Sequence, residues 1–121
     1  DDGAGGYVSK KITGAELKNS SLIFTTNSTY NFSLVDANKT VFLADATSVI
    51  ARIPNNTSVA FDIGTRIELI QNDSGSVQIV PVSGVTLKSE GAKDSLSAQY
   101  SQATLLKTDT NTWYLFGEIT T

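Results

Sequence analysis

The chain of 121 residues has a formal net charge of −3 and contains no cysteine, histidine or methionine, which excludes a disulfide framework, a zinc cluster and a thiol nucleophile. It has no basic block to attract a phosphate backbone and no apolar run of membrane-spanning length, so we expect neither nucleic-acid binding nor membrane insertion. Only 17% of the residues are charged, and the abundant serine, threonine and asparagine favour strands and turns over solvent-facing helices.

The chain divides into a short N-terminal segment and one β domain. Residues 1–18 are predicted to be an arm or linker, because they begin with an acidic, glycine-rich stretch. Residues 19–121 are predicted to form the domain, which opens with a short apolar run at 22–24. A half-buried strand is expected next, because Tyr30, Phe32 and Leu34 alternate with polar residues.

The middle of the chain predicts two short strands and then a central hairpin. The short strands are expected at 41–44 and 49–53, and Pro54 ends the second because it has no N–H to donate. The hairpin is expected over 64–80, where two alternating strands flank the polar corner at 72–75.

The last third of the chain completes an all-β pattern. We expect a loop at 89–97 and two final strands at 103–107 and 113–119. About ten short strands with regularly spaced turn signals predict an antiparallel, jelly-roll-like β-sandwich. No internal repeat of solenoid length is apparent.

Several of these strands are apolar on both faces, whereas a single sandwich core covers only one face of each sheet. The second face is therefore covered either by loops of the same chain or by neighbouring subunits of an oligomer. The candidate oligomer interface residues are Val80, Val82, Leu106, Tyr114 and Phe116.

Catalysis is poorly supported by the residues present. Most carboxylates lie at turns, where aspartate is favoured for backbone reasons. Asp62 and Glu68 are the pair to test if an activity on polysaccharides exists, since glycosidases need two facing carboxylates. The oxygen-rich segments 36–38 and 72–74 do not match the spaced loop of a calcium-binding EF-hand. We therefore predict no catalytic residue, no cofactor and no metal.

Aromatic residues are candidates for stacking on sugars, but lone aromatic residues in strands are more often part of a core, and we expect this of Trp113. Tyr100 lies in a polar setting and is the candidate glycan contact. Seven of the eight asparagines begin an Asn-x-Ser/Thr sequence, a pattern that either marks glycosylation or reflects abundant serine and threonine in turns; we favour the second explanation.

The order and spacing of several short segments resemble those of domains found in bacteriophage tail fibre, tail spike and related virion appendage proteins. The resemblance spans roughly residues 29–117. The segments that carry it are TYNFSL at 29–34, DANKTV at 36–41, VAF at 59–61, the glycine-containing run at 64–77, GVTL at 84–87, QYSQATL at 99–105 and NTWYLFG at 111–117.

This resemblance implies an all-β, homotrimeric structural protein of the virion, without catalytic residues common to the family. Some of these domains bind host surface receptors, and others cap or trimerise a fibre. We therefore expect a non-enzymatic appendage domain for attachment or assembly, which contacts other virion proteins and host surface glycans. The alternatives are a capsid decoration protein attached through its N-terminal arm, and a carbohydrate-binding module of a secreted bacterial enzyme.

Overall fold

The structure is a computed structural model that describes residues 21–121. The predicted arm at 1–18 therefore lies outside the described residues. Within them, the two 3-10 helices are η1 (Leu34–Asp36) and η2 (Glu90–Ala92). The strands are β2 (Leu22–Thr25), β3 (Thr29–Asn31), β4 (Thr40–Leu43), β5 (Val49–Ile53), β6 (Arg66–Gln71), β7 (Val77–Pro81), β8 (Thr86–Ser89), β9 (Ser95–Leu96), β10 (Gln102–Asp109), β11 (Thr112–Gly117) and β12 (Ile119–Thr120).

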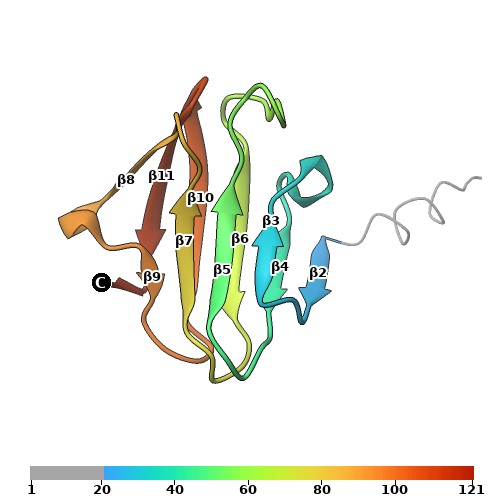
Figure 1. The fold of residues 1–121 in the computed structure, drawn as a ribbon, viewed down its shortest axis with the longest axis vertical. Helices are drawn as coiled ribbons and strands as arrows, with labels where there is room; N and C mark the ends of the chain where they lie inside the picture. The colour runs from blue at the N-terminus through green and yellow to red at the C-terminus, as the bar shows by residue number, and fades with distance from the viewer. Residues whose placement is uncertain (1–20) are drawn as a thin grey trace, which may run out of the picture.

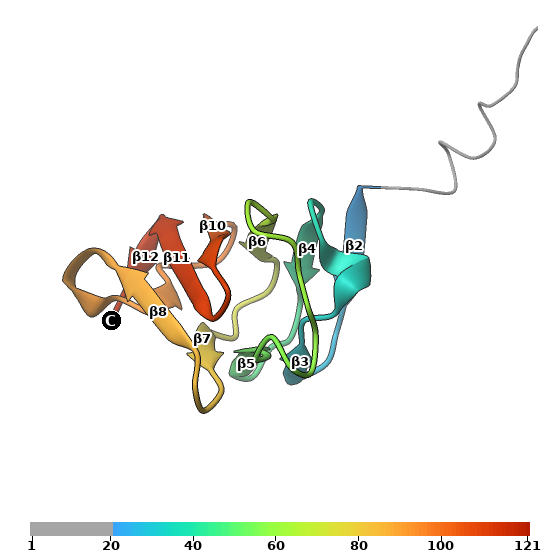
Figure 2. The same cartoon turned by 90° about the horizontal axis from the view of Figure 1, so that it is seen from above.

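The strands form two sheets that pack face to face, which confirms the predicted all-β sandwich. One sheet has six strands in the order β2-β4-β6-β10-β11-β8, and the other has five in the order β12-β9-β7-β5-β3. Figure 1 looks onto the five-stranded sheet, and Figure 2 shows β2, β4 and β6 in one layer with β3, β5 and β7 in the other. Alternate residues of each strand point between the layers and make the apolar core.

The sequence predicted antiparallel sheets, but both sheets contain parallel and antiparallel strand pairs. Strand β4 pairs in parallel with both β2 and β6, and β5 pairs in parallel with both β3 and β7. The antiparallel pairs lie in the C-terminal half, where β10 pairs with β6 and β11. The sequence pattern did not distinguish the two arrangements, because both strand types here have one face in the core and alternate with a period of two.

The predicted central hairpin is wrong, because β6 and β7 lie in different sheets. The polar corner between them turns the chain from one layer to the other, so the inward side chains of Leu69 and Ile79 both enter the core between the layers. The backbone groups of β6 bond to β4 and β10 instead of β7. The corner is therefore an arch between two sheets.

Successive arches stack on one another through backbone hydrogen bonds. The amide of Gly75 donates to the Asp45 carbonyl oxygen at 2.9 Å, and the amide of Val49 donates to the Ser76 carbonyl oxygen at 2.7 Å. A Cβ at Gly75 would overlap the carbonyl oxygens of Asp45 and Thr47, so glycine permits this close approach. By contrast, no atom lies within 4 Å of a Cβ placed at Gly64, so the positive φ of 96° explains the glycine there.

Residues 22–81 thus form a stack of three parallel coils, each made of two strands joined by an arch: β2–β3, β4–β5 and β6–β7. This arrangement is a short β-solenoid. Leu22 pairs with Thr40 and Thr40 pairs with Glu68, so successive coils advance by 18 and then 28 residues. The unequal advance explains why no repeat was apparent in the sequence.

Two local predictions also need correction. The alternating run at 30–34 does not continue as a strand, because η1 begins at Leu34 and leaves that side chain 59% exposed while Phe32 is buried. The predicted loop at 89–97 contains η2 and the two-residue strand β9. Trp113 is only 1% exposed, which confirms its place in the core.

Candidate functional site

The outer face of the six-stranded sheet carries a band of apolar and aromatic side chains, here called the aromatic face. Its members alternate with core residues along β2, β4, β6, β10 and β11, which turns them away from the core. Phe24 is 64% exposed, and its ring stacks on that of Phe42 with the centroids 4.4 Å apart. The aromatic face consists of Leu22, Phe24, Phe42, Ile70, Leu106, Tyr114 and Phe116.

Three of the predicted interface residues lie together on this face. Leu106 on β10 pairs in register with Tyr114 on β11, and Phe116 follows two positions later on the same strand. Tyr114 is 39% exposed and Phe116 is 42% exposed, so the rest of the described chain leaves both accessible to solvent. Lys88 places its Nζ 5.7 Å from the centroid of the Tyr114 ring, within the range of a cation–π contact.

A polar group lies at the centre of the aromatic face. The carboxylate oxygen Oε1 of Glu68 accepts hydrogen bonds from the Thr104 hydroxyl at 2.5 Å and from the Gln102 side-chain amide at 3.0 Å. These donors hold the carboxylate against the sheet, and part of its hydrogen-bonding capacity is satisfied within the chain. The aromatic face is therefore an apolar surface with a fixed acceptor at its middle.

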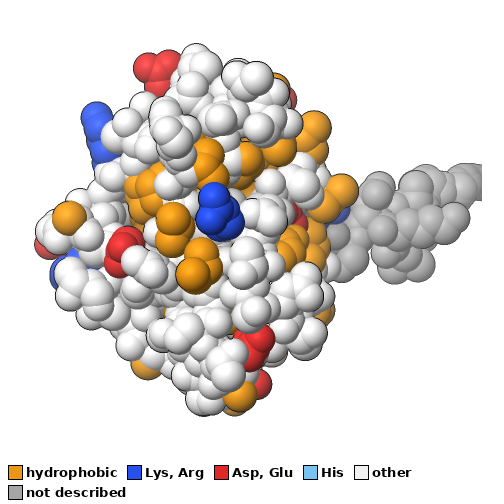
Figure 3. Space-filling model, in the orientation of Figure 1, with side chains coloured by type: hydrophobic (Ala, Val, Ile, Leu, Met, Phe, Trp, Pro, Cys, Tyr) orange, Lys and Arg blue, Asp and Glu red, His pale blue; other side chains and the backbone are white. Residues whose placement is uncertain are grey.

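The other two predicted interface residues lie on the opposite side of the sandwich. Val80 pairs in register with Arg52, and both alternate with buried residues, so they face outward from the five-stranded sheet. Val82 follows β7 and is half-buried. Figure 3 shows hydrophobic side chains gathered around one basic side chain over the middle of this sheet. The five predicted residues therefore divide between two faces and do not form one continuous surface.

Tyr100, the predicted glycan contact, is held in an exposed and strained position. Its side chain is 71% exposed, and its backbone has a φ of 71°, a left-handed conformation that bulky residues rarely adopt. The amide of Tyr100 donates to the Gln71 carbonyl oxygen at 2.6 Å, and the Ser101 hydroxyl donates to the Ala98 carbonyl oxygen at 2.6 Å. These bonds hold the turn in place, and the phenol ring is presented to solvent at the end of the sandwich where the arches lie.

Two buried charged residues were missed by the sequence reasoning. Asp36 is fully buried and accepts hydrogen bonds from the Tyr30 hydroxyl at 2.6 Å and from the Ser33 amide at 2.9 Å. The Ser-x-x-Asp spacing at 33–36 signals this local capping arrangement in the sequence. Lys107 is 2% exposed and occupies the next inward position after Ala103 and Leu105. The alternation along this strand was therefore the signal that could have placed Lys107 in the core.

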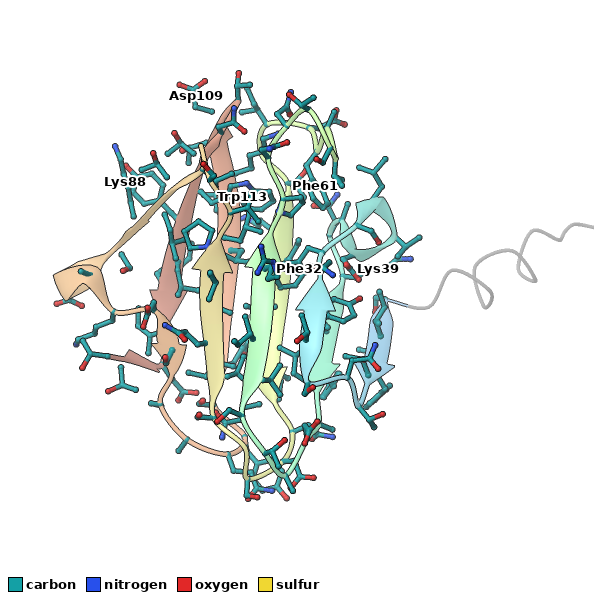
Figure 4. The ribbon with its side chains drawn as sticks, viewed as in Figure 1. Phe32, Lys39, Phe61, Lys88, Asp109 and Trp113 are labelled. Atoms are coloured by element: carbon teal, nitrogen blue, oxygen red, sulfur yellow. The ribbon has the colours of Figure 1, made fainter. Side chains whose placement is uncertain are left out.

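Lys107 lies in the core near two aromatic residues, Phe61 and Trp113. Phe61 and Trp113 meet edge to face with their ring centroids 5.3 Å apart, and Lys107 pairs in register with Trp113. Figure 4 shows both rings near the upper end of the sandwich. The Lys107 Nζ donates to the Phe61 carbonyl oxygen and to Asn56 Oδ1, both at 2.7 Å. Burial lowers the pKa of Lys107, and the charge of Asp62 partly opposes this shift.

An open pocket of about 460 Å³ lies near the same end, between η1 and the loop before β6. Its walls include Leu34, Asn38 and residues 60–65. Asp62 is the one carboxylate in this lining, whereas Glu68 lies on the aromatic face, so the pocket does not bring the two carboxylates together. Paired carboxylates a few ångströms apart are what glycoside hydrolysis requires.

Residues 21–121 were also searched for a metal site and for a membrane-spanning helix. Within 21–121 there is no group of three or more histidine, cysteine, aspartate or glutamate residues placed to hold a metal ion. In the same part of the chain, no helix has the length and apolar character needed to cross a bilayer. Comparisons with protein-family models, with curated proteins and with solved structures found no match to the chain.

Proposed function

We propose that this chain is a non-enzymatic structural domain of a bacteriophage virion appendage, and that it assembles as a homotrimer through its aromatic face. The exposed aromatic face is the observation that carries the proposal. Aromatic residues are enriched in the buried centres of protein interfaces, and a contiguous exposed apolar patch is typical of an interaction site. The sequence resemblance to appendage domains supplies the biological setting, in the virion among other virion proteins.

A threefold assembly requires that two different patches of each subunit meet around the axis. The aromatic face offers two such patches on one sheet, because the stacked Phe24 and Phe42 lie on its N-terminal side while Tyr114 and Phe116 lie beyond β10. The polar group of Glu68 separates them. We therefore expect the Phe24 side of one subunit to contact the Tyr114 side of the next.

Light scattering on the purified chain at micromolar concentration tests the assembly. We expect a mass of three times 12.9 kDa for the wild-type protein, and a single subunit for the variant with both Leu106→Glu and Phe116→Glu. The matched control is Ile50→Glu, which adds a charge at a 40% exposed position on the opposite sheet and should leave the trimer intact. A monomeric wild type, or dissociation by Ile50→Glu alone, would contradict the proposal.

The capsid decoration alternative within the same class differs in its attachment. If the protein decorates capsids through its N-terminal arm, it should bind undecorated capsids, and deletion of residues 1–18 should abolish the binding. An appendage domain should show no such binding before or after the deletion.

The exposed Tyr100 favours glycan binding as a second function, either in host attachment or as a carbohydrate-binding module. An exposed tyrosine ring held by a fixed backbone is a suitable stacking surface for a sugar. A glycan array with the wild type and with Tyr100→Ala tests this function. We expect the wild type to bind one or more glycans and Tyr100→Ala to bind none of them. If the wild type binds no glycan on the array, this second function is contradicted.

A further inference from the structure

A buried amine and a side-chain amide from distant parts of the chain are in direct contact. The Nζ of Lys107 on β10 donates a hydrogen bond of 2.7 Å to Oδ1 of Asn56, 51 residues earlier in the chain. The side-chain carbonyl carbon of Asn56 is covalently bonded to that oxygen. The lysine nitrogen therefore lies next to an amide carbon that a neutral amine can attack.

Both partners are held in place by contacts on either side. The backbone amide of Asn56 donates to Oδ1 of Asn111 at 2.8 Å, and Asn111 lies in the turn that follows the lysine-bearing strand. The lysine Nζ is fixed a second time by the Phe61 carbonyl oxygen at 2.7 Å. The 54–65 connection and the β10–β11 turn are thus bound to each other, which keeps the amine and the amide in register.

The surroundings favour the reactive form of the amine. Lys107 is 2% exposed and lies beside Trp113, in a part of the core that Phe61 also lines. Removal of the ammonium group from water disfavours its charge, so burial lowers the pKa of Lys107 although Asp62 opposes the shift. A larger fraction of this lysine is therefore neutral than of a lysine in water, and the neutral amine is the nucleophile.

We propose that Lys107 and Asn56 join in an intramolecular isopeptide bond. The Nζ lone pair attacks Cγ of Asn56, the new Nζ–Cγ bond forms, and the Cγ–Nδ2 bond breaks. One proton of the lysine nitrogen passes to Nδ2, which leaves as ammonia. The reaction needs no oxidant, reductant or external reactant. This modification does not depend on the proposed function.

The bond would close a covalent loop through the sandwich. It would join the connection between β5 and β6 to β10, next to the core contact of Phe61 with Trp113. Because the chain contains no cysteine, a disulfide cannot supply such a cross-link. An isopeptide bond restricts the unfolded chain by the same principle, and reducing agents do not break it.

Mass spectrometry of the purified full chain tests the proposal. We expect an intact mass lower than the sequence mass by one ammonia molecule. Trypsin cleaves after lysine and arginine, so a free Lys107 would yield separate peptides covering 53–66, 94–107 and 108–121. The cross-linked protein should instead give one branched peptide that joins 53–66 to 94–121, because trypsin does not cleave after a modified lysine.

Three variants give the controls. Lys107→Arg retains the positive charge without a nucleophilic amine, and Asn56→Ala removes the amide, so both should show the full sequence mass. Asn55→Ala alters the adjacent asparagine, whose Oδ1 accepts a hydrogen bond from the Ser58 backbone amide and not from Lys107. This variant should still lose ammonia. The wild-type peptide map also decides the matter if a variant fails to fold.

Two results would overturn the proposal. One is a wild-type protein of full sequence mass with normal cleavage after Lys107. The other is loss of ammonia without the branched peptide, because a cyclised asparagine elsewhere in the chain produces the same mass change.

Discussion

The hydroxyl of Tyr30 donates a 2.6 Å hydrogen bond to a carboxylate oxygen of Asp36, which has no solvent exposure. The second carboxylate oxygen accepts from the amide of Ser33, so two donors from the chain surround a buried charge. This contact connects β3 to η1, at the point where the chain passes from the first coil to the second. The stability of that passage therefore depends on the phenol as a hydrogen-bond donor.

The variant Tyr30→Phe removes this donor while it keeps the aromatic ring. Because the buried carboxylate loses one of its two donors, we expect the free energy of unfolding to fall by about 1–3 kcal/mol. Denaturant unfolding followed by circular dichroism measures the change. Tyr114→Phe on the aromatic face is the matched control and should shift the value by less than about 0.5 kcal/mol. Equal effects of the two substitutions would show that the Tyr30 hydroxyl has no special role.

Because of the same contact, the stability of the folded chain depends on pH in the alkaline range. Burial, followed by the hydrogen bond and charge of Asp36, raises the pKa of Tyr30 above its ordinary value of 10.0. Above about pH 10, the unfolded chain therefore releases a phenolic proton that the folded chain still holds, and stability falls as pH rises. Urea unfolding at about pH 9 and about pH 11 should show a smaller loss for Tyr30→Phe than for the wild type. An identical loss in both proteins would contradict this titration.

Gly75→Ala should destabilise the stacked arches. The added Cβ would overlap carbonyl oxygens of Asp45 and Thr47, so the arches must separate and their hydrogen bonds weaken. We expect a loss of about 2 kcal/mol or more, in the range of overpacking and broken buried bonds. Gly84→Ala is the control, because its φ of 89° is strained but the space around it is open. That variant should lose only about 1 kcal/mol, and a larger loss than that of Gly75→Ala would contradict the arch packing.

Tyr100→Gly should separate stability from recognition. Glycine adopts the left-handed backbone at this position without strain, so we expect the free energy of unfolding to rise by about 1 kcal/mol. The same substitution removes the exposed ring and should abolish any glycan binding. Thermal unfolding and the glycan array measure the two effects. A loss of stability would instead show that the Tyr100 ring supports the fold.

The local alternation of residues predicted much of the inward and outward pattern. It placed Trp113 in the core and Leu106 and Tyr114 on an outer face, as the structure has them. It did not predict that the corner at 72–75 is an arch. A hairpin and an arch share the same alternation, and the choice depends on pairing with strands that lie far away in the sequence.

The candidate site was predicted only in part for a similar reason. Leu106, Tyr114 and Phe116 were found because their strands are apolar on both faces. Phe24 and Phe42 lie in short apolar segments whose outward-facing side the sequence analysis did not recognise as apolar. Only parallel pairing of β2 with β4 brings those two rings together. Lys107 was missed because a charged residue at an inward position is unusual, and its partner Asn56 is distant in the chain.

The two ends of the coil stack are built differently, and this difference affects how the protein can evolve. At one end the coils turn through the short arches 26–28, 44–48 and 72–76, in which Ser28, Asp45 and Ser76 each accept a backbone hydrogen bond from the adjacent coil. At the other end, the connections 32–39 and 54–65 differ in length and border the open pocket. Insertions at exposed positions of these connections, such as 62–64, leave the strand ladders unchanged. Natural selection can therefore reshape the pocket end in related proteins while the arch end, with its close backbone contacts, keeps its form.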